Sequence, residues 1–152
     1  MSPVGIGYDS HRFEEGRRLV LGGVEITHER GLAGHSDADV ITHAVIDALL
    51  GAGGLGDIGT LFPDHDDRWK DADSVDLLRT VMVQVPGRVV NVDATVVCEE
   101  PRLGRYRGEM ERILAEATSA RVSVKATSNE GMGWIGRHEG IACIAVASVE
   151  VD

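Results

Sequence analysis

The stretch "SDADVITHAVIDALLGAGG", residues 36–54, decides the fold because it carries the clearest helix pattern in the chain. Ser36 or Asp37 is a suitable cap for its start, and the glycines at 51, 53 and 54 mark its end. Its apolar side chains recur at helical spacing, which predicts that one face points into a core. Those side chains are Val40, Ile41, Ala44, Val45, Ala48 and Leu49.

The segments around this helix read as a mixture of strands and helices. Before it we expect a strand at 3–9 and a hairpin at 17–27 that turns at Gly22-Gly23. A long loop at 55–73 follows, and loops of this length in small domains are usually functional or mobile. The remaining expected elements are helices at 73–85 and 105–119 and strands at 89–99, 122–127 and 140–151. This order predicts an α+β fold, with helices on one face of a sheet of four or more strands.

The last predicted strand, "GIACIAVASVEV" (140–151), is apolar on both of its faces. The chain has few helices to cover two sheet faces. An oligomer that buries the second face is the simplest arrangement, so we expect this chain to associate with copies of itself.

Composition narrows the classes of protein to which the chain can belong. We expect a single domain over residues 1–152, because 152 residues with 43% hydrophobic content suffice for one core. A net charge of −10 argues against general binding of nucleic acid or anionic membranes. Cys98 and Cys143 lie in apolar runs, as buried thiols of a reducing compartment do. Without a signal-peptide pattern, we expect a cytoplasmic protein.

The first strand carries Asp9 and His11, which point the same way because side chains alternate along a strand. His43 lies on the 36–54 helix, with Asp39 and Asp47 one turn away on either side. Two imidazoles and one carboxylate suit a Zn²⁺ ion with an open fourth position. Asp39 or Asp47 would then bond the second ring nitrogen of His43. Taken alone, these residues are explained more simply as a surface aspartate and packed histidines.

Several polar segments offer groups that bind phosphate or hydroxyls. His35 and Ser36 precede a helix start, where an anion binds well, although a serine there also serves as a cap. Asp57, Asp64 and Asp66 fit tight turns, and alternatively hold hydroxyl groups of a polyol. His65 reads as an exposed bystander.

The segment "KATSNEGMGWIGRHEG" (125–140) joins the last two strands. Thr127, Ser128 and Asn129 offer donors to phosphate oxygens, and Glu130 could bind Mg²⁺. The chain has no Walker lysine pattern, no dinucleotide-binding glycine fingerprint and no hydrolase elbow. It therefore offers metal ligands and phosphate donors without an obvious protein nucleophile.

Four motifs together resemble one known family. "GIGYDSHRF", "GLAGHSDADVITHAVIDALLGAGGLGDIGTLFPD", "VKATSNEGMGWIGR" and "EGIACIAVA" are similar, in this order, to the 2-C-methyl-D-erythritol 2,4-cyclodiphosphate synthases. The resemblance implies a homotrimer of ferredoxin-like subunits with a mainly four-stranded sheet, packed through the sheets, and active sites between subunits. It also implies that the 2-phosphate of 4-diphosphocytidyl-2-C-methyl-D-erythritol 2-phosphate attacks the β-phosphorus and releases CMP.

The resemblance assigns roles residue by residue. Asp9, His11 and His43 match the zinc ligands, and Glu130 matches a ligand of Mg²⁺ or Mn²⁺. His35 and Ser128 match the catalytic pair that orients the reacting phosphorus. The substrate-binding positions are Asp9, His11, His35, Ser36, Asp57, Ile58, Gly59, Phe62, Pro63, Asp64, His65, Asp66, Cys98, Glu99, Glu100, Pro101, Arg102, Leu103, Gly104, Thr127, Ser128, Asn129, Glu130, Trp134 and Arg137.

Two other functions remain compatible with the same residues. A zinc-dependent phosphohydrolase would place water at the open metal position and give an acyclic product. A trimeric nucleotide- or metal-binding protein would bind CDP without releasing CMP. Analysis of the products distinguishes all three.

Overall fold

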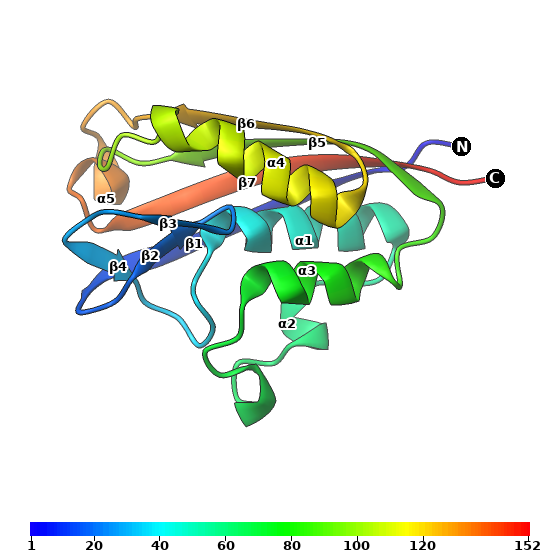
Figure 1. Ribbon diagram of the computed structural model, residues 1–152, viewed down its shortest axis with the longest axis horizontal. Helices are drawn as coiled ribbons and strands as arrows, with labels where there is room; N and C mark the ends of the chain where they lie inside the picture. Colours follow the sequence, from blue (N-terminus) through cyan, green and yellow to red (C-terminus); the bar gives the residue numbers. More distant parts are fainter.

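The first and last strands of the chain pair along most of their length within a five-stranded sheet (Figure 1). The computed structural model describes all residues, 1–152. Strand β1 (Val4–Glu15) runs antiparallel to β7 (Gly140–Glu150), with Val4 opposite Ser148 and Arg12 opposite Gly140. The sheet order is β4-β1-β7-β5-β6, which makes β7 the central strand.

The other strands complete the sheet on both sides of this pair. Strand β4 (Arg30–Leu32) pairs antiparallel with the end of β1 at one edge. Strand β5 (Arg88–Val97) is antiparallel to β7, and β6 (Arg121–Thr127) is parallel to β5 at the other edge. A separate hairpin of β2 (Leu19–Leu21) and β3 (Val24–Ile26) turns at Gly22-Gly23, as predicted.

Three longer helices pack against the sheet and against one another. Helix α1 (Val40–Gly53) lies on β1 and β7, and α4 (Arg107–Thr118) lies on β6. Helix α3 (Ser74–Met82) contacts both of these helices. Figure 1 shows α1 and α3 running side by side, with α2 beyond them. None of the helices is long and apolar enough to cross a membrane.

The short helical segments lie in the connections. They are α2 (Ile58–Leu61), α5 (Gly133–Gly136) and the 3₁₀ turns η1 (Asp67–Trp69) and η2 (Gly104–Tyr106). Two of them, α2 and η1, lie within residues 55–73, the segment predicted as a long loop.

The core lies between the helices and one face of the sheet. On β7 the inward side chains Cys143, Ala145 and Ala147 are fully or almost fully buried. The alternate side chains Ile144 and Val146 are 43% and 40% exposed on the opposite face. The apolar character that the sequence shows on both sides of this strand is therefore covered on one side only within a single chain. Both cysteines are free and buried.

Two expectations about the framework were wrong. The main sheet has five strands, which agrees with the four or more expected from the sequence pattern but not with the mainly four-stranded sheet implied by the resemblance. Three residues of β4 add an edge strand too short to give a periodic pattern. The cap of α1 is Asp39, whose side chain accepts the N–H of Thr42, and not Ser36 or Asp37. Residues 36–39 instead form an irregular turn in which Ala38 has a φ of 58°.

Candidate functional site

Asp9, His11 and His43 converge where β1 meets the first turns of α1. Their ligand atoms all lie within 4.8 Å of one another. The Oδ2 atom of Asp9 is 2.8 Å from Nε2 of His11 and 3.1 Å from Nδ1 of His43. The two imidazole nitrogens are 3.4 Å apart. The structure thus brings together the three residues that the sequence placed on a strand and a helix.

Two glycines of β1 explain why the helix comes so close to the strand. Gly5 and Gly7 share the inward face of β1 with Asp9 and His11 because side chains alternate along a strand. A Cβ built on Gly5 would lie 1.9 Å from the Ala48 carbonyl oxygen. The absence of side chains at these glycines lets the backbone of α1 rest directly on β1 and presents His43 to Asp9.

Within the cluster, Asp9 and His43 each stabilise the charged form of the other. Burial opposes ionisation of Asp9, but hydrogen bonds and charge interactions with His11 and His43 lower the pKa of this carboxyl to about 2. Burial likewise opposes a charged His43, and its hydrogen bond to Asp9, followed by the charges of Asp9, Asp39 and Asp37, raises the pKa of this imidazole. The site thus gathers negative charge around two imidazoles, which is an environment that attracts a cation.

The donor set fits a divalent metal ion. One carboxylate oxygen and two imidazole nitrogens, partly or fully shielded from solvent, are the ligands that open zinc sites use. Three atoms within 4.8 Å of one another can bind one ion together while leaving a further position free.

The outer partner of His43 differs from the prediction. Neither Asp39 nor Asp47 contacts the second ring nitrogen of His43. Asp39 accepts the N–H groups of Gly22 and Gly23 at 2.8 Å each, and Asp47 accepts the N–H of Ile58 at 2.7 Å.

Two serines take that place instead. His43 Nε2 lies 2.8 Å from Oγ of Ser74 and 3.2 Å from Oγ of Ser36. Ser74 begins α3, and no local sequence pattern distinguishes it from an ordinary residue at a helix start.

A cavity of about 600 Å³ opens beside the three clustered residues. The proposed metal ligand His43 lines it together with many predicted substrate-binding residues, namely Asp9, His11, His35, Ser36, Ile58, Gly59, Phe62, Pro63, Asp64 and His65. The ring of His35 is held by a contact of 3.0 Å between its Nε2 and the backbone oxygen of Asp66. Four further lining residues were not predicted from the sequence: Gly34, Thr60, Trp69 and Leu77.

Two predicted aspartates near this cavity serve as helix caps. Asp57 accepts the N–H and the hydroxyl of Thr60 at the start of α2, and these bonds lower the pKa of its carboxyl. Asp66 caps η1 and pairs with Arg68, which lowers the pKa of Asp66 to about 2. Neither carboxylate lines the cavity.

A second group of predicted residues forms its own cluster. The N–H of Cys98 donates to the carbonyl of Thr127, and Glu99 Oε1 accepts the N–H groups of Asn129 and Gly131 at 3.1 and 2.9 Å. These bonds hold the segments 98–104 and 127–131 side by side. No residue of either segment lines the 600 Å³ cavity, and Glu130 is exposed and outside the metal-type cluster.

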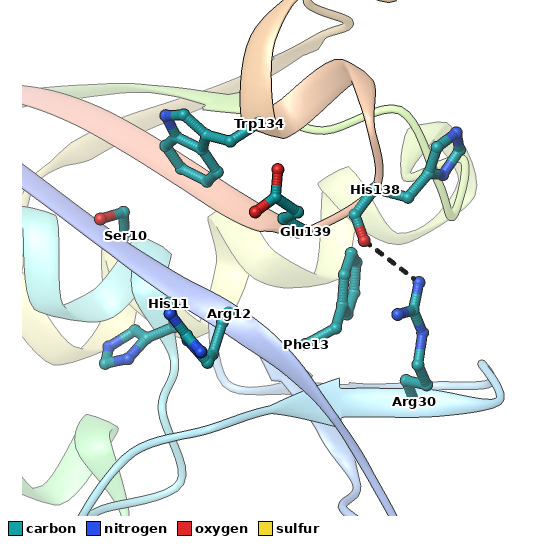
Figure 2. A pocket seen from close by; sticks show the side chains of 8 residues that line it. All are labelled: Ser10, His11, Arg12, Phe13, Arg30, Trp134, His138 and Glu139. Atoms are coloured by element: carbon teal, nitrogen blue, oxygen red, sulfur yellow. Dashed lines mark hydrogen bonds between the residues drawn. The ribbon is translucent and has the colours of Figure 1, made fainter.

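Trp134 and Arg137 lie outside the 600 Å³ cavity, in and directly after helix α5. Trp134 of α5 lines a different cavity of about 520 Å³, together with Arg12, Phe13 and Glu139 (Figure 2). The dashed line in Figure 2 marks the contact of 3.4 Å between Arg30 and the carbonyl of His138. Arg137 pairs with Glu139 at 2.9 Å.

Comparison with known proteins identifies the family. Residues 3–150 match the model of the YgbB family. A 2-C-methyl-D-erythritol 2,4-cyclodiphosphate synthase of Salinibacter ruber is 56% identical over 153 residues, which cover 97% of this chain and 98% of that protein.

Solved structures agree in fold. The bifunctional IspDF of Campylobacter jejuni superposes with a TM-score of 0.95 at 39% identity, covering all of this chain and 43% of that longer one. A 2C-methyl-D-erythritol-2,4-cyclodiphosphate synthase solved with CDP bound has a TM-score of 0.88 at 35% identity and covers 97% of this chain and 99% of its own. The chain belongs to the YgbB family of 2-C-methyl-D-erythritol 2,4-cyclodiphosphate synthases.

Proposed function

We propose that this chain converts 4-diphosphocytidyl-2-C-methyl-D-erythritol 2-phosphate into 2-C-methyl-D-erythritol 2,4-cyclodiphosphate, with release of CMP, in the non-mevalonate route to isoprenoid precursors. The 2-phosphate attacks the β-phosphorus of the same molecule, and the bond from that phosphorus to the CMP oxygen breaks. The enzyme is then a metal-dependent phosphorus–oxygen lyase of the cytoplasm. The convergence of Asp9, His11 and His43 beside a cavity of about 600 Å³, in a chain of this family, carries the proposal.

The nucleophile explains why the chain needs no activated serine or cysteine. A phosphate is already anionic near neutral pH, so the protein has to position it and to offset charge in the transition state. His35 and Ser36 line the cavity next to His43, so a phosphate bound there would lie beside the His35 ring and the Ser36 hydroxyl. Ile58, Gly59 and Asp64 line the same cavity and would contact the hydroxyl-bearing part of the substrate.

Two kinds of cation would be bound. Asp9, His11 and His43 would hold Zn²⁺, and Glu130 would hold Mg²⁺ or Mn²⁺. Zinc supplies a Lewis acid that polarises a phosphoryl oxygen. Divalent cations also account for how a chain with a net charge of −10 accepts a polyanionic substrate.

The separation of the two residue groups supports an active site shared between copies of the chain. The cluster around segments 98–104 and 127–131, which includes Ser128 and Glu130, does not reach the cavity of its own chain. In our proposal it binds the cytidine and the second cation in a cavity of a neighbouring subunit.

The uncovered face of the sheet supports a homotrimer of ferredoxin-like subunits. Ile6 and Tyr8 of β1, 71% and 55% exposed, lie opposite Val146 and Ile144 of β7 and form an apolar strip. Monomeric proteins seldom expose such a strip to solvent. We therefore expect the sheets of neighbouring subunits to pack against one another.

Product analysis tests the proposed reaction. The purified protein is incubated with the substrate, Zn²⁺ and Mg²⁺, and the products are followed by ³¹P NMR and nucleotide chromatography. We expect cyclic diphosphate and CMP in equal amounts. An acyclic product would indicate the phosphohydrolase, and CDP binding without any CMP would indicate a non-catalytic binding protein.

A further inference from the structure

Ser74 and Asp37 form a hydrogen-bonded chain behind His43, on the side of the ring that faces away from Asp9. Oγ of Ser74 lies 2.8 Å from Nε2 of His43 and also contacts Oδ1 of Asp37. Asp37 additionally accepts the backbone N–H of Ser74 at 3.0 Å. Ser74 is fully buried, so water does not compete for its hydroxyl.

The direction of these bonds follows from the number of protons available. An ionised carboxylate only accepts, so the single hydroxyl proton of Ser74 is donated to Asp37. A lone pair of the same oxygen then faces His43 Nε2, which must carry a proton to bond to it. In the neutral imidazole that binds a metal ion, the other nitrogen, Nδ1, then carries the lone pair that faces Asp9 and His11.

We propose that Ser74, held by Asp37, is a positioning residue that fixes the ring tautomer and orientation in which His43 binds the metal ion. This inference rests on the proposed metal site of Asp9, His11 and His43. The supporting geometry comes from three separate elements: β1 carries Asp9, α1 carries His43 and α3 carries Ser74. Helix α3 thereby acts on the metal site although it contributes no ligand to it.

Ser36 is a weaker candidate for the same role. Its Oγ is 3.2 Å from His43 Nε2 and also accepts the N–H of Ala38 at 3.2 Å. Both contacts are longer than the one made by Ser74. Ser36 also lines the cavity.

Zinc affinity tests the proposal independently of turnover. Metal-free wild type and Ser74→Ala are titrated with Zn²⁺ in competition with a chromophoric chelator. Loss of an outer partner of a ligating histidine typically weakens binding by about 10–100-fold, and we expect a loss in this range. The matched control is Thr118→Val, which removes another buried hydroxyl, one bonded to the Leu114 carbonyl in α4. We expect the zinc affinity of this control to stay within about threefold of that of wild type, because Thr118 bonds to none of the metal ligands.

A spectroscopic measurement separates positioning from general stability. In zinc-loaded wild type labelled with ¹⁵N-histidine, the Nε2 proton of His43 should appear as a slowly exchanging ring signal, and Ser74→Ala should lose it to exchange. Asp37→Asn provides a second variant should Ser74→Ala not fold, and it should weaken zinc binding in the same direction. Wild type that binds no zinc would overturn both the metal site and this inference. The inference alone would be overturned if wild type binds zinc and folded Ser74→Ala has a zinc affinity within about threefold of that of wild type. If Ser74→Ala does not fold, the same criterion applies to Asp37→Asn.

Discussion

Gly7 of β1 lies directly against the Ala44 carbonyl of α1, and a Cβ added to Gly7 would be 1.9 Å from that oxygen. Gly7→Ala should therefore force strand and helix apart. Because the obstacle is backbone, we expect a loss of at least about 2 kcal/mol in the free energy of unfolding. Urea denaturation measures this loss of stability. Gly108→Ala is the control, since Gly108 is in α4 with nothing within 4 Å of the added carbon, and it should stabilise by about 0.5 kcal/mol. Equal stabilities of the two variants would contradict the close packing.

His43→Ala should abolish both zinc binding and turnover. The substitution removes one of three converging ligand atoms and leaves Asp9 with a single imidazole partner. Zinc per chain is measured by atomic emission after purification in zinc-containing buffer. His28→Ala removes an imidazole that packs near Phe13, outside the cluster, and should keep the full zinc content. Wild-type zinc content in the His43 variant would rule out this ligand set.

Glu130→Gln should change the requirement for the second cation and leave zinc in place. The variant keeps the size of the side chain and loses the charge that a hard cation prefers. We expect the Mg²⁺ concentration for half-maximal rate to rise by about tenfold or more, because the affinity for a hard cation depends on the number of charged ligands. Glu116→Gln, at an exposed position of α4, is the matched control. An unchanged Mg²⁺ dependence would assign the second cation elsewhere.

Ile6→Arg should dissociate the proposed trimer. Ile6 is 71% exposed in the middle of the apolar strip, and a charge buried there between sheets would have no partner. Light scattering should give the mass of one chain, 16.3 kDa, in place of three. Val83→Arg changes another exposed apolar residue, directly after the end of α3, and should leave the assembly intact. Activity of the monomeric variant would argue against a site shared between subunits.

The metal-type cluster was predictable because its parts follow local periodicity. Alternation along a strand aligned Asp9 with His11, and the helix pattern of 36–54 placed His43 on a recognisable element. The cap of α1 was misplaced because several residues before it are good caps. Asp39 caps the helix while it also accepts the N–H groups of Gly22 and Gly23, and these contacts join residues far apart in sequence.

The neighbours of the cluster could not be predicted for a related reason. Ser74 reaches His43 because α3 packs on α1, and no spacing within the chain encodes that contact. Strand β4 and helix α5 are three and four residues long, too short for any period to appear. The division of the predicted substrate contacts between two clusters is likewise a property of the folded chain.

The pairing of β1 with β7 also dictates when the metal site can form during synthesis. Asp9, His11 and His43 are translated well before β7, the strand that aligns β1. Asp9 is paired with Cys143 and His11 with Ile141, so the register of two ligands depends on residues more than a hundred positions later. Such distant pairing slows folding and leaves the nascent sheet open to misassociation. The folded register of Asp9 and His11 therefore has to wait until β7 has been translated.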